Sequence, residues 1–313
     1  MARLGRIVFL GTGRFAVPLL RRLPEVADDL LVVTAADRPA GRGLQVQRSP
    51  IASAAVALGL PTLQPERLRS SGAVDVLRDY RPDGLLLAAY GQLVPPDLLA
   101  LAPRSALNVH PSLLPRHRGP APIVGTILAG DNEAGVTLMV MTPELDAGPV
   151  AAQWRMPLSG RERGDELETV LANLAGERVP EMLEAWSDGR LKAAPQDSSQ
   201  ATYTRVLTRA DGKIDWTQPA EQIDRQVRAL QPWPGAWTTR DGLRLHVRRA
   251  HPRDEETDAA PGTVLPDRPV RVATGRGVLV LEAVQPEGRG QMTADAWRNG
   301  LVRGPVVLGG GPA

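Results

Sequence analysis

The chain has 313 residues, of which 42% are hydrophobic and 23% charged, and its formal net charge is +2. This balance is typical of a soluble globular protein of about two domains, and no apolar run approaches the roughly 18 residues of a membrane helix. The absence of cysteine excludes disulfides, a thiolate nucleophile and a Cys-ligated zinc, which fits a cytoplasmic location. A net charge this small also excludes a uniformly basic nucleic-acid coat, so any RNA binding must come from local patches.

Short apolar runs alternate with helix-like patterns in the first part of the chain. The runs, rich in Val, Leu and Ile, predict buried strands at residues 6–11, 30–35, 83–90, 106–110 and 135–141. This alternation predicts an α/β fold with a doubly wound, mostly parallel sheet of the Rossmann-like kind. A long amphipathic helix over 163–186 follows, in which Pro180 predicts a kink or a break.

The rest of the chain is organised differently. Residues 187–204 are polar, as linkers are, and one helical run at 219–230 precedes short apolar pieces separated by Gly and Pro. Such spacing predicts a small, OB-like β-barrel. We therefore predict a catalytic domain over 1–189, a linker over 190–206 and a β-barrel domain over 207–313.

A glycine-rich turn follows the first strand, in FLGTGRF at residues 9–15. A dinucleotide site would need a third glycine three residues after Gly13, where this chain has Ala16. A tight strand-to-helix turn is the better interpretation, and nucleotide binding stays the alternative.

The loop ADRPAGRGLQVQRSP, residues 36–50, is too long for an ordinary connection between a strand and a helix. It carries Arg38, Arg42 and Arg48 among prolines and glycines. Guanidinium groups can bind phosphates, so an anion site is one interpretation, but for the charge run alone a solvated surface is the favoured one.

The stretch LNVHPSLLPRHRGPAPI, residues 107–123, leaves a strand at the edge of the sheet where ligands bind in open α/β folds. Asn108 and His110 lie two residues apart and so share one face of the strand end. With Asp146, in a loop after another strand, they form a candidate acid–base cluster from neighbouring strand ends. Since the chain has neither a GxSxG motif nor a cysteine, a covalent acyl-enzyme is not expected. A metal pair of His110 and His117 is the weaker alternative, and no metal is expected.

These motifs resemble the signature of the folate-dependent formyltransferases, in which a strand-borne Asn and His precede an SLLP loop. LDAGP, around Asp146, matches the third catalytic residue of that family. Four further stretches occur in the order found in members that act on initiator tRNA. They are DRPAGRG, QPERL, AYGQLVP and RALQPWPGAW. The chain departs from the family pattern at Gly13 and His117, and at Leu44 and Gln45, where lysine is usual.

The resemblance implies transfer of a formyl group from 10-formyltetrahydrofolate to the α-amino group of methionine esterified to initiator tRNA. By this resemblance the catalytic residues are Asn108, His110 and Asp146. Backbone groups would line the folate pocket at Ser112, Leu113, Leu114, Pro115, Tyr90, Gly91 and Gln92. Contacts to tRNA are expected from Arg38, Arg42, Arg228, Arg248 and Arg249. A cytoplasmic monomer without membrane contact is expected.

Residues 225–253 carry seven arginines against Asp241 alone, with Trp233 and Trp237 among them. This suits binding to an RNA backbone, although packing of both tryptophans inside the barrel is the favoured interpretation of their rings. Two rival functions stay open: formylation of another amine, such as a nucleotide sugar or glycinamide ribonucleotide, and RNA binding by a catalytically dead scaffold.

Overall fold

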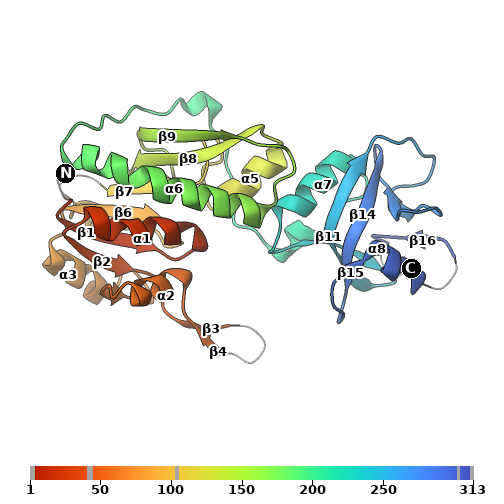
Figure 1. The fold of residues 1–313 in the computed structure, drawn as a ribbon, viewed down its shortest axis with the longest axis horizontal. Coiled ribbons are helices and arrows are strands. Elements are labelled where there is room, and N and C mark those ends of the chain that lie inside the picture. Colours follow the sequence, from red (N-terminus) through yellow and green to blue (C-terminus); the bar gives the residue numbers. More distant parts are fainter. Residues whose placement is uncertain (1–3, 41–44, 103–105, 302–303, 311–313) are drawn as a thin grey trace. The chain divides into compact units, whose positions relative to one another are not determined.

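The computed structural model describes residues 4–40, 45–102, 106–301 and 304–310 (Figure 1). The chain divides into two compact units, which are described separately. The first comprises Met1–Pro122, Glu133–Pro157 and Leu167–Arg205, and the second comprises Ile123–Asn132, Leu158–Glu166 and Val206–Ala313. Two short segments inside the residue range predicted for the catalytic domain therefore belong to the second unit. In the described residues, no helix is long and apolar enough to cross a membrane.

The first unit is built on a seven-stranded sheet of order β5-β2-β1-β6-β7-β8-β9. Its strands are β1 Arg6–Gly11, β2 Asp29–Val33, β5 Thr62–Leu63, β6 Gly84–Ala88, β7 Ala106–His110, β8 Glu133–Val140 and β9 Val150–Pro157. The five strands from β5 to β7 are parallel, whereas β8 and β9 are antiparallel to their neighbours. The predicted mostly parallel α/β sheet is confirmed, and β5 and β9 are additional strands.

Helices lie between these strands or, in the case of α6, after the last of them. They are η1 Arg14–Ala16, α1 Val17–Val26, α2 Pro50–Ala57, α3 Ser71–Tyr80, α4 Pro96–Leu99 and α6 Gly164–Ser187. The start of α2 shows a local cause, since the Ser49 hydroxyl accepts the N–H of Ala52 at 2.9 Å and Pro50 occupies the first turn. All five residues of β6 are buried, as expected for a sheet covered on both faces.

The long helix α6 continues through Pro180, so of the kink or break predicted there the break is wrong. A proline inside a helix costs about 3 kcal/mol. One stripe of the helix offsets that cost, because five side chains spaced four residues apart are at most 1% exposed. They are Leu167, Leu171, Ala175, Val179 and Leu183.

The long loop after β2 contains two short strands, β3 Arg38–Ala40 and β4 Gln45–Gln47. They pair antiparallel, with Arg38 opposite Gln47. The loop is therefore a β-ribbon at its base, as Figure 1 shows, which the sequence pattern did not predict. Arg42 lies outside the described residues.

The second unit is mainly an antiparallel sheet of order β10-β11-β14-β13-β12-β16, with β15 on β14. Its strands are β10 Ala236–Arg240, β11 Leu243–Arg253, β12 Thr263–Val264, β13 Arg271–Ala273, β14 Val278–Pro286, β15 Met292–Thr293 and β16 Val306–Val307. Helices α5 Pro122–Ala129, α7 Ala220–Ala229, α8 Ala294–Asn299 and the short η3 Arg209–Gly212 complete it. Beyond β16, Gly309 donates to the carbonyl of Thr239 in β10 at 2.8 Å, so the sheet curls back on itself. Its core includes Trp216 and Trp297, and the predicted small barrel is confirmed.

Candidate active site

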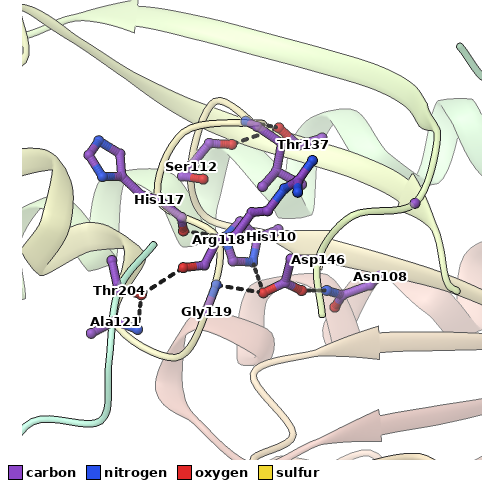
Figure 2. A network of polar contacts seen from close by, with 12 residues as sticks. Asn108, His110, Ser112, His117, Arg118, Gly119, Ala121, Thr137, Asp146 and Thr204 are labelled. Carbon is purple, nitrogen blue, oxygen red and sulfur yellow. Dashed lines mark hydrogen bonds and ion pairs between the residues drawn. The ribbon is translucent and has the colours of Figure 1, made fainter. Parts of the chain in front are cut away.

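Strand β7 carries Asn108 and His110 on one face, as its alternating pattern predicts. The third residue, Asp146, does not follow a strand that ends beside the end of β7, as was expected. Strand β8 is antiparallel to β7, with Val140 opposite Leu107, so β8 ends beside the start of β7. The three residues therefore do not come from neighbouring strand ends. The loop from 141 to 149 turns back and places Asp146 against Asn108 and His110, as Figure 2 shows.

Asp146 joins the polar groups of the site. Its Oδ1 lies 3.4 Å from the Asn108 Nδ2 donor, and its Oδ2 lies 3.7 Å from Nδ1 of His110. The backbone N–H of Gly119 donates to Oδ2 at 2.8 Å. Only 12% of the Asp146 side chain and 5% of the His110 side chain are exposed, so these contacts are largely shielded from water.

The tautomer of His110 follows from its second contact. Nε2 lies 3.0 Å from the backbone carbonyl of His117, which can only accept a hydrogen bond, so Nε2 carries a proton. In the neutral ring, Nδ1 is then unprotonated and faces the Asp146 carboxylate. Nδ1 of His110 and Oδ2 of Asp146 can both accept a proton, so the pair can bind one proton between them.

Burial of the ring lowers the pKa of His110 below its ordinary value of 6.5. The negative charge of Asp146 and the hydrogen bond to the His117 carbonyl act in the opposite direction, and the nearby His117 ring adds to the lowering. The imidazole is therefore neutral at physiological pH.

The backbone is strained at two of these positions. Asp146 has φ 49° and His117 has φ 60°, in the left-handed region that costs a non-glycine residue about 1 to 2 kcal/mol. The return of the loop also needs a glycine at position 148, because a Cβ there would lie within van der Waals overlap, 1.8 Å from the Val140 carbonyl oxygen. The surrounding hydrogen bonds hold this strained arrangement in place.

The loop over 112–115 is fixed by two side chains that sequence reasoning missed. The Thr137 hydroxyl donates to the Ser112 carbonyl at 2.6 Å and accepts the Leu114 N–H at 3.2 Å. Gln153 donates to the Leu114 carbonyl at 2.6 Å and to the Thr137 hydroxyl at 3.0 Å. Thr137 had a signal in the sequence, since it is a polar residue inside an apolar strand.

Several residues predicted to line the folate pocket have other contacts. Ser112 and Leu114 are buried, and their backbone groups bond to Thr137 or Gln153. Leu113 and Pro115 are only partly buried. Leu113 is packed so closely on Gly135 that a Cβ at that glycine would lie 2.4 Å from its Cδ2. Contacts within the chain thus fix the conformation of this loop without a ligand.

The loop after β6 behaves similarly. The Tyr90 ring is buried in the core of the first unit, which raises the pKa of its hydroxyl to about 12. The Gln92 amide oxygen accepts the N–H of Leu68 at 2.9 Å. Gly91, by contrast, is exposed, has φ 75° and has open space where a side chain would stand. Of these three residues, Gly91 presents its backbone most openly to a ligand.

The described arginines predicted to contact tRNA differ in exposure. Arg228 is only 15% exposed, with its guanidinium bound to Asp224 at 2.8 Å and to the Glu162 carbonyl at 2.9 Å. Arg248 is half-buried and donates to Gln285. Arg38 is exposed, and Arg249 is 67% exposed beside Glu282. Arg38 and Arg249 therefore present their charge to solvent, whereas Arg228 and Arg248 serve internal contacts.

The two tryptophans of PWPGAW also differ. Trp237 donates from Nε1 to the Arg209 carbonyl at 3.0 Å and stacks under the Arg244 guanidinium, 4.3 Å from the ring centroid. Trp233 is 54% exposed, so packing inside the barrel is the wrong interpretation for its ring. No cluster of three His, Asp or Glu side chains suited to a metal is present in the described part of the chain.

Comparison with known proteins finds relatives along most of the chain. Residues 5–183 match the formyl transferase family and residues 206–302 match the formyl transferase C-terminal domain. A methionyl-tRNA formyltransferase of Roseiflexus castenholzii is 47% identical over 312 residues, covering 97% of this chain and 99% of the relative. One from Myxococcus xanthus is 45% identical over 291 residues, covering 92% and 93%.

A solved structure shares the fold. HypX from Aquifex aeolicus, in complex with tetrahydrofolic acid, superposes with a TM-score of 0.58 at 21% identity, covering 93% of this chain and 46% of HypX. The Asn108, His110 and Asp146 arrangement lies within the first matched region. The two regions together cover most of the chain, and the chain therefore belongs to the formyl transferase family.

Proposed function

We propose that this chain transfers the formyl group of 10-formyltetrahydrofolate to the α-amino group of methionine esterified to initiator tRNA. The observation that carries the proposal is the contact of Asp146 with both Asn108 and His110. The name shared by full-length relatives at 45–47% identity supports the choice of substrate. Such a role in translation initiation places the protein in the cytoplasm.

The reaction needs no nucleophile from the protein. The amine of an aminoacyl ester is itself nucleophilic when neutral, and its attack leaves a negative charge on the formyl oxygen. An amide nitrogen carries two N–H groups, of which Asn108 uses one toward Asp146. The other is available to stabilise that oxygen, an interaction usually worth about 3 to 4 kcal/mol.

The His110–Asp146 pair manages the proton. The His117 carbonyl fixes the proton on Nε2, so the facing Nδ1 and carboxylate together accept the proton that the attacking amine loses. The pair then returns it to the nitrogen of the leaving donor. In this scheme Asp146 also holds the imidazole ring in its orientation, and its negative charge favours the protonated form.

The surroundings suit a flat folate ring. The backbone loop of 112–115 is held by Thr137 and Gln153, and a Cβ at Gly91, in the loop after β6, would meet nothing within 4 Å. Two leucines beyond the ends of β6 and β8 are unusually open for apolar side chains, Leu93 at 69% and Leu145 at 56% exposure. Apolar surface beside convergent polar groups is the usual composition of a site for a heteroaromatic ligand.

The tRNA would use exposed basic and aromatic groups in each unit. Arg38 on the β3–β4 ribbon and Arg249 on β11 present guanidinium groups to solvent, and Trp233 offers an open ring for stacking. Arg42 belongs to the same proposal on sequence grounds. Phosphate contacts of this kind weaken as salt rises.

A single assay tests the proposal. The purified chain is mixed with 10-formyltetrahydrofolate and methionine-charged initiator or elongator tRNA, and the N-formylmethionyl ester is quantified. We expect product from the initiator. No product from either tRNA, with a donor that another formyltransferase consumes, contradicts the proposal. Product from a nucleotide amino sugar would favour the rival substrate class.

A further inference from the structure

The segment between the two family regions lies against the candidate active site. The matched regions end at residue 183 and resume at 206, and the sequence pattern predicts a linker there. Within the first unit, however, Ala194 exchanges two backbone hydrogen bonds with Val150, at 2.8 and 2.9 Å. Tyr203 then forms a parallel bridge with Arg118. Residues 194–204 thus pack on the catalytic loops and do not behave as a free linker.

The end of this segment holds the loop that carries the His117 carbonyl. The Thr202 hydroxyl accepts the His117 N–H at 2.8 Å. The Thr204 hydroxyl donates to the Arg118 carbonyl at 3.0 Å and accepts the Ala121 N–H at 3.1 Å, as Figure 2 shows. The partner of His110 Nε2 is therefore placed by residues more than eighty positions later in the chain.

Gln196 reaches Asp146 itself. Its amide nitrogen donates to the backbone carbonyls of Asp146, at 2.9 Å, and Gly148, at 2.7 Å. Its amide oxygen accepts from Nε and Nη2 of Arg118, at 3.1 and 2.8 Å. One side chain thus joins the strained loop that presents Asp146 to the loop that presents Gly119 N–H to the same carboxylate.

The chemistry of these partners requires an amide at position 196. The two carbonyls need a donor, while the guanidinium of Arg118, a residue only 4% exposed, needs an acceptor. Glutamine supplies both at once, and glutamate would supply only the acceptor. Tyr203 holds the other side of Arg118 through its hydroxyl at 3.1 Å and through its ring, 5.8 Å from the guanidinium carbon.

We infer that Gln196, in the segment between the two family regions, is a positioning residue for Asp146. The inference rests on the proposed function for its kinetic test only. Asp146 stands at φ 49° and its side chain contacts two catalytic groups, so a small movement of its backbone separates the carboxylate from His110. A misplacement near 1 Å can cost about a hundredfold in rate.

The test uses Gln196→Glu, which keeps the acceptor for Arg118 and removes both donors to the loop. We expect kcat to fall by about ten- to a hundredfold, with KM for donor and tRNA within about twofold of wild type. The unfolding temperature should fall only moderately, because two backbone carbonyls lose their donor but the buried guanidinium keeps a partner. Gln196→Asn carries the same amide on a side chain one methylene shorter, and its kcat should fall similarly. It replaces the Glu variant in the test if that variant fails to fold.

A second readout does not depend on activity. The Gly119 amide donates to Asp146 Oδ2, so its hydrogen exchange, followed by NMR, reports whether the carboxylate is in place. Exchange at Gly119 should accelerate in Gln196→Glu. The matched control is Gln200→Glu in the same segment, where the exposed Gln200 amide contacts Asp197 at 2.7 Å. It should leave both rate and exchange unchanged.

The outcomes separate the two proposals. Wild-type protein that forms no product from charged tRNA contradicts the proposed function, while Gly119 exchange still decides the role of Gln196. An active wild type with kcat within twofold and unchanged Gly119 exchange in both Gln196 variants overturns the positioning role. The positioning role is also overturned if the Gln196 variants keep the kcat of wild type while the KM values for donor and tRNA rise together.

Discussion

His110 donates from Nε2 to the backbone carbonyl of His117 at 3.0 Å, seven residues further along the chain. His117 stands at φ 60°, and its own N–H is held by Thr202. The imidazole therefore has its tautomer imposed by a backbone group. This leaves Nδ1 free to share a proton with Asp146.

Replacing Asp146 by Asn should therefore slow the reaction much more than it weakens binding. The amide keeps the size of the side chain but removes the negative charge that favours protonation of His110. We expect kcat to fall by at least about a hundredfold, with KM values changed little. Steady-state kinetics with each substrate varied in turn checks this. An equal loss in Glu144→Gln, a nearby exposed carboxylate, would point to a general charge effect.

The lowered pKa of His110 predicts how stability depends on pH. The unfolded chain binds a proton near pH 6.5, whereas the folded chain binds it only at lower pH, so the unfolded state holds more protons between these values. Stability should therefore rise with pH through this window and level off above about 6.5.

Urea unfolding at several pH values measures this dependence. The pKa of His246 is lowered as well, by burial and by Arg248 and Arg244, so wild type must be compared with His110→Asn. The variant should show a smaller increase of unfolding free energy across the window. Identical slopes would show that His110 does not carry the effect.

Part of the candidate site can be predicted from the sequence, and part of it cannot. Asn108 and His110 were placed correctly because alternation along a strand fixes which side chains share a face. The antiparallel direction of β8 could not be predicted, since an apolar run has the same pattern in a parallel and in an antiparallel strand. The contacts of Gln196 and Arg228 could not be predicted for a related reason, because a polar residue in the sequence does not reveal whether its partner is water or another group of the protein.

Thr137→Val should weaken use of the formyl donor. The substitution leaves the Ser112 carbonyl and the Leu114 N–H without the hydroxyl, at a cost of about 1 to 3 kcal/mol for each unsatisfied buried group. We expect a lower unfolding temperature and a raised KM for the donor, with KM for tRNA unchanged. Thr142→Val removes a contact at the surface, to the Glu144 carbonyl, and is the control. A selective rise in KM for tRNA would contradict the placement of the donor.

Gly148→Ala should disable the site through its backbone. A Cβ at this position would stand 1.8 Å from the Val140 carbonyl oxygen, so the loop that carries Asp146 must move. We expect kcat to fall strongly while the sheet stays folded. Gly72→Ala is the control, since a Cβ there meets nothing within 4 Å and alanine favours the helix α3. Wild-type kinetics in Gly148→Ala would show that the loop tolerates another path.

Arg249 offers a prediction of increased affinity. Its guanidinium lies 2.5 Å from Glu282, which also contacts His251 at 2.7 Å, so a tRNA phosphate must compete with this carboxylate for the arginine. Glu282→Gln removes the competing charge and should bind tRNA more tightly, whereas Arg249→Ala should bind more weakly and lower the slope of log affinity against log salt by about one. Trp233→Ala should weaken binding with almost no change of slope, because stacking releases no counterion. Filter binding across a range of salt concentrations distinguishes these effects. Weaker binding by Glu282→Gln, with unfolding unchanged, would show that the carboxylate orients Arg249 for the RNA and does not compete with it.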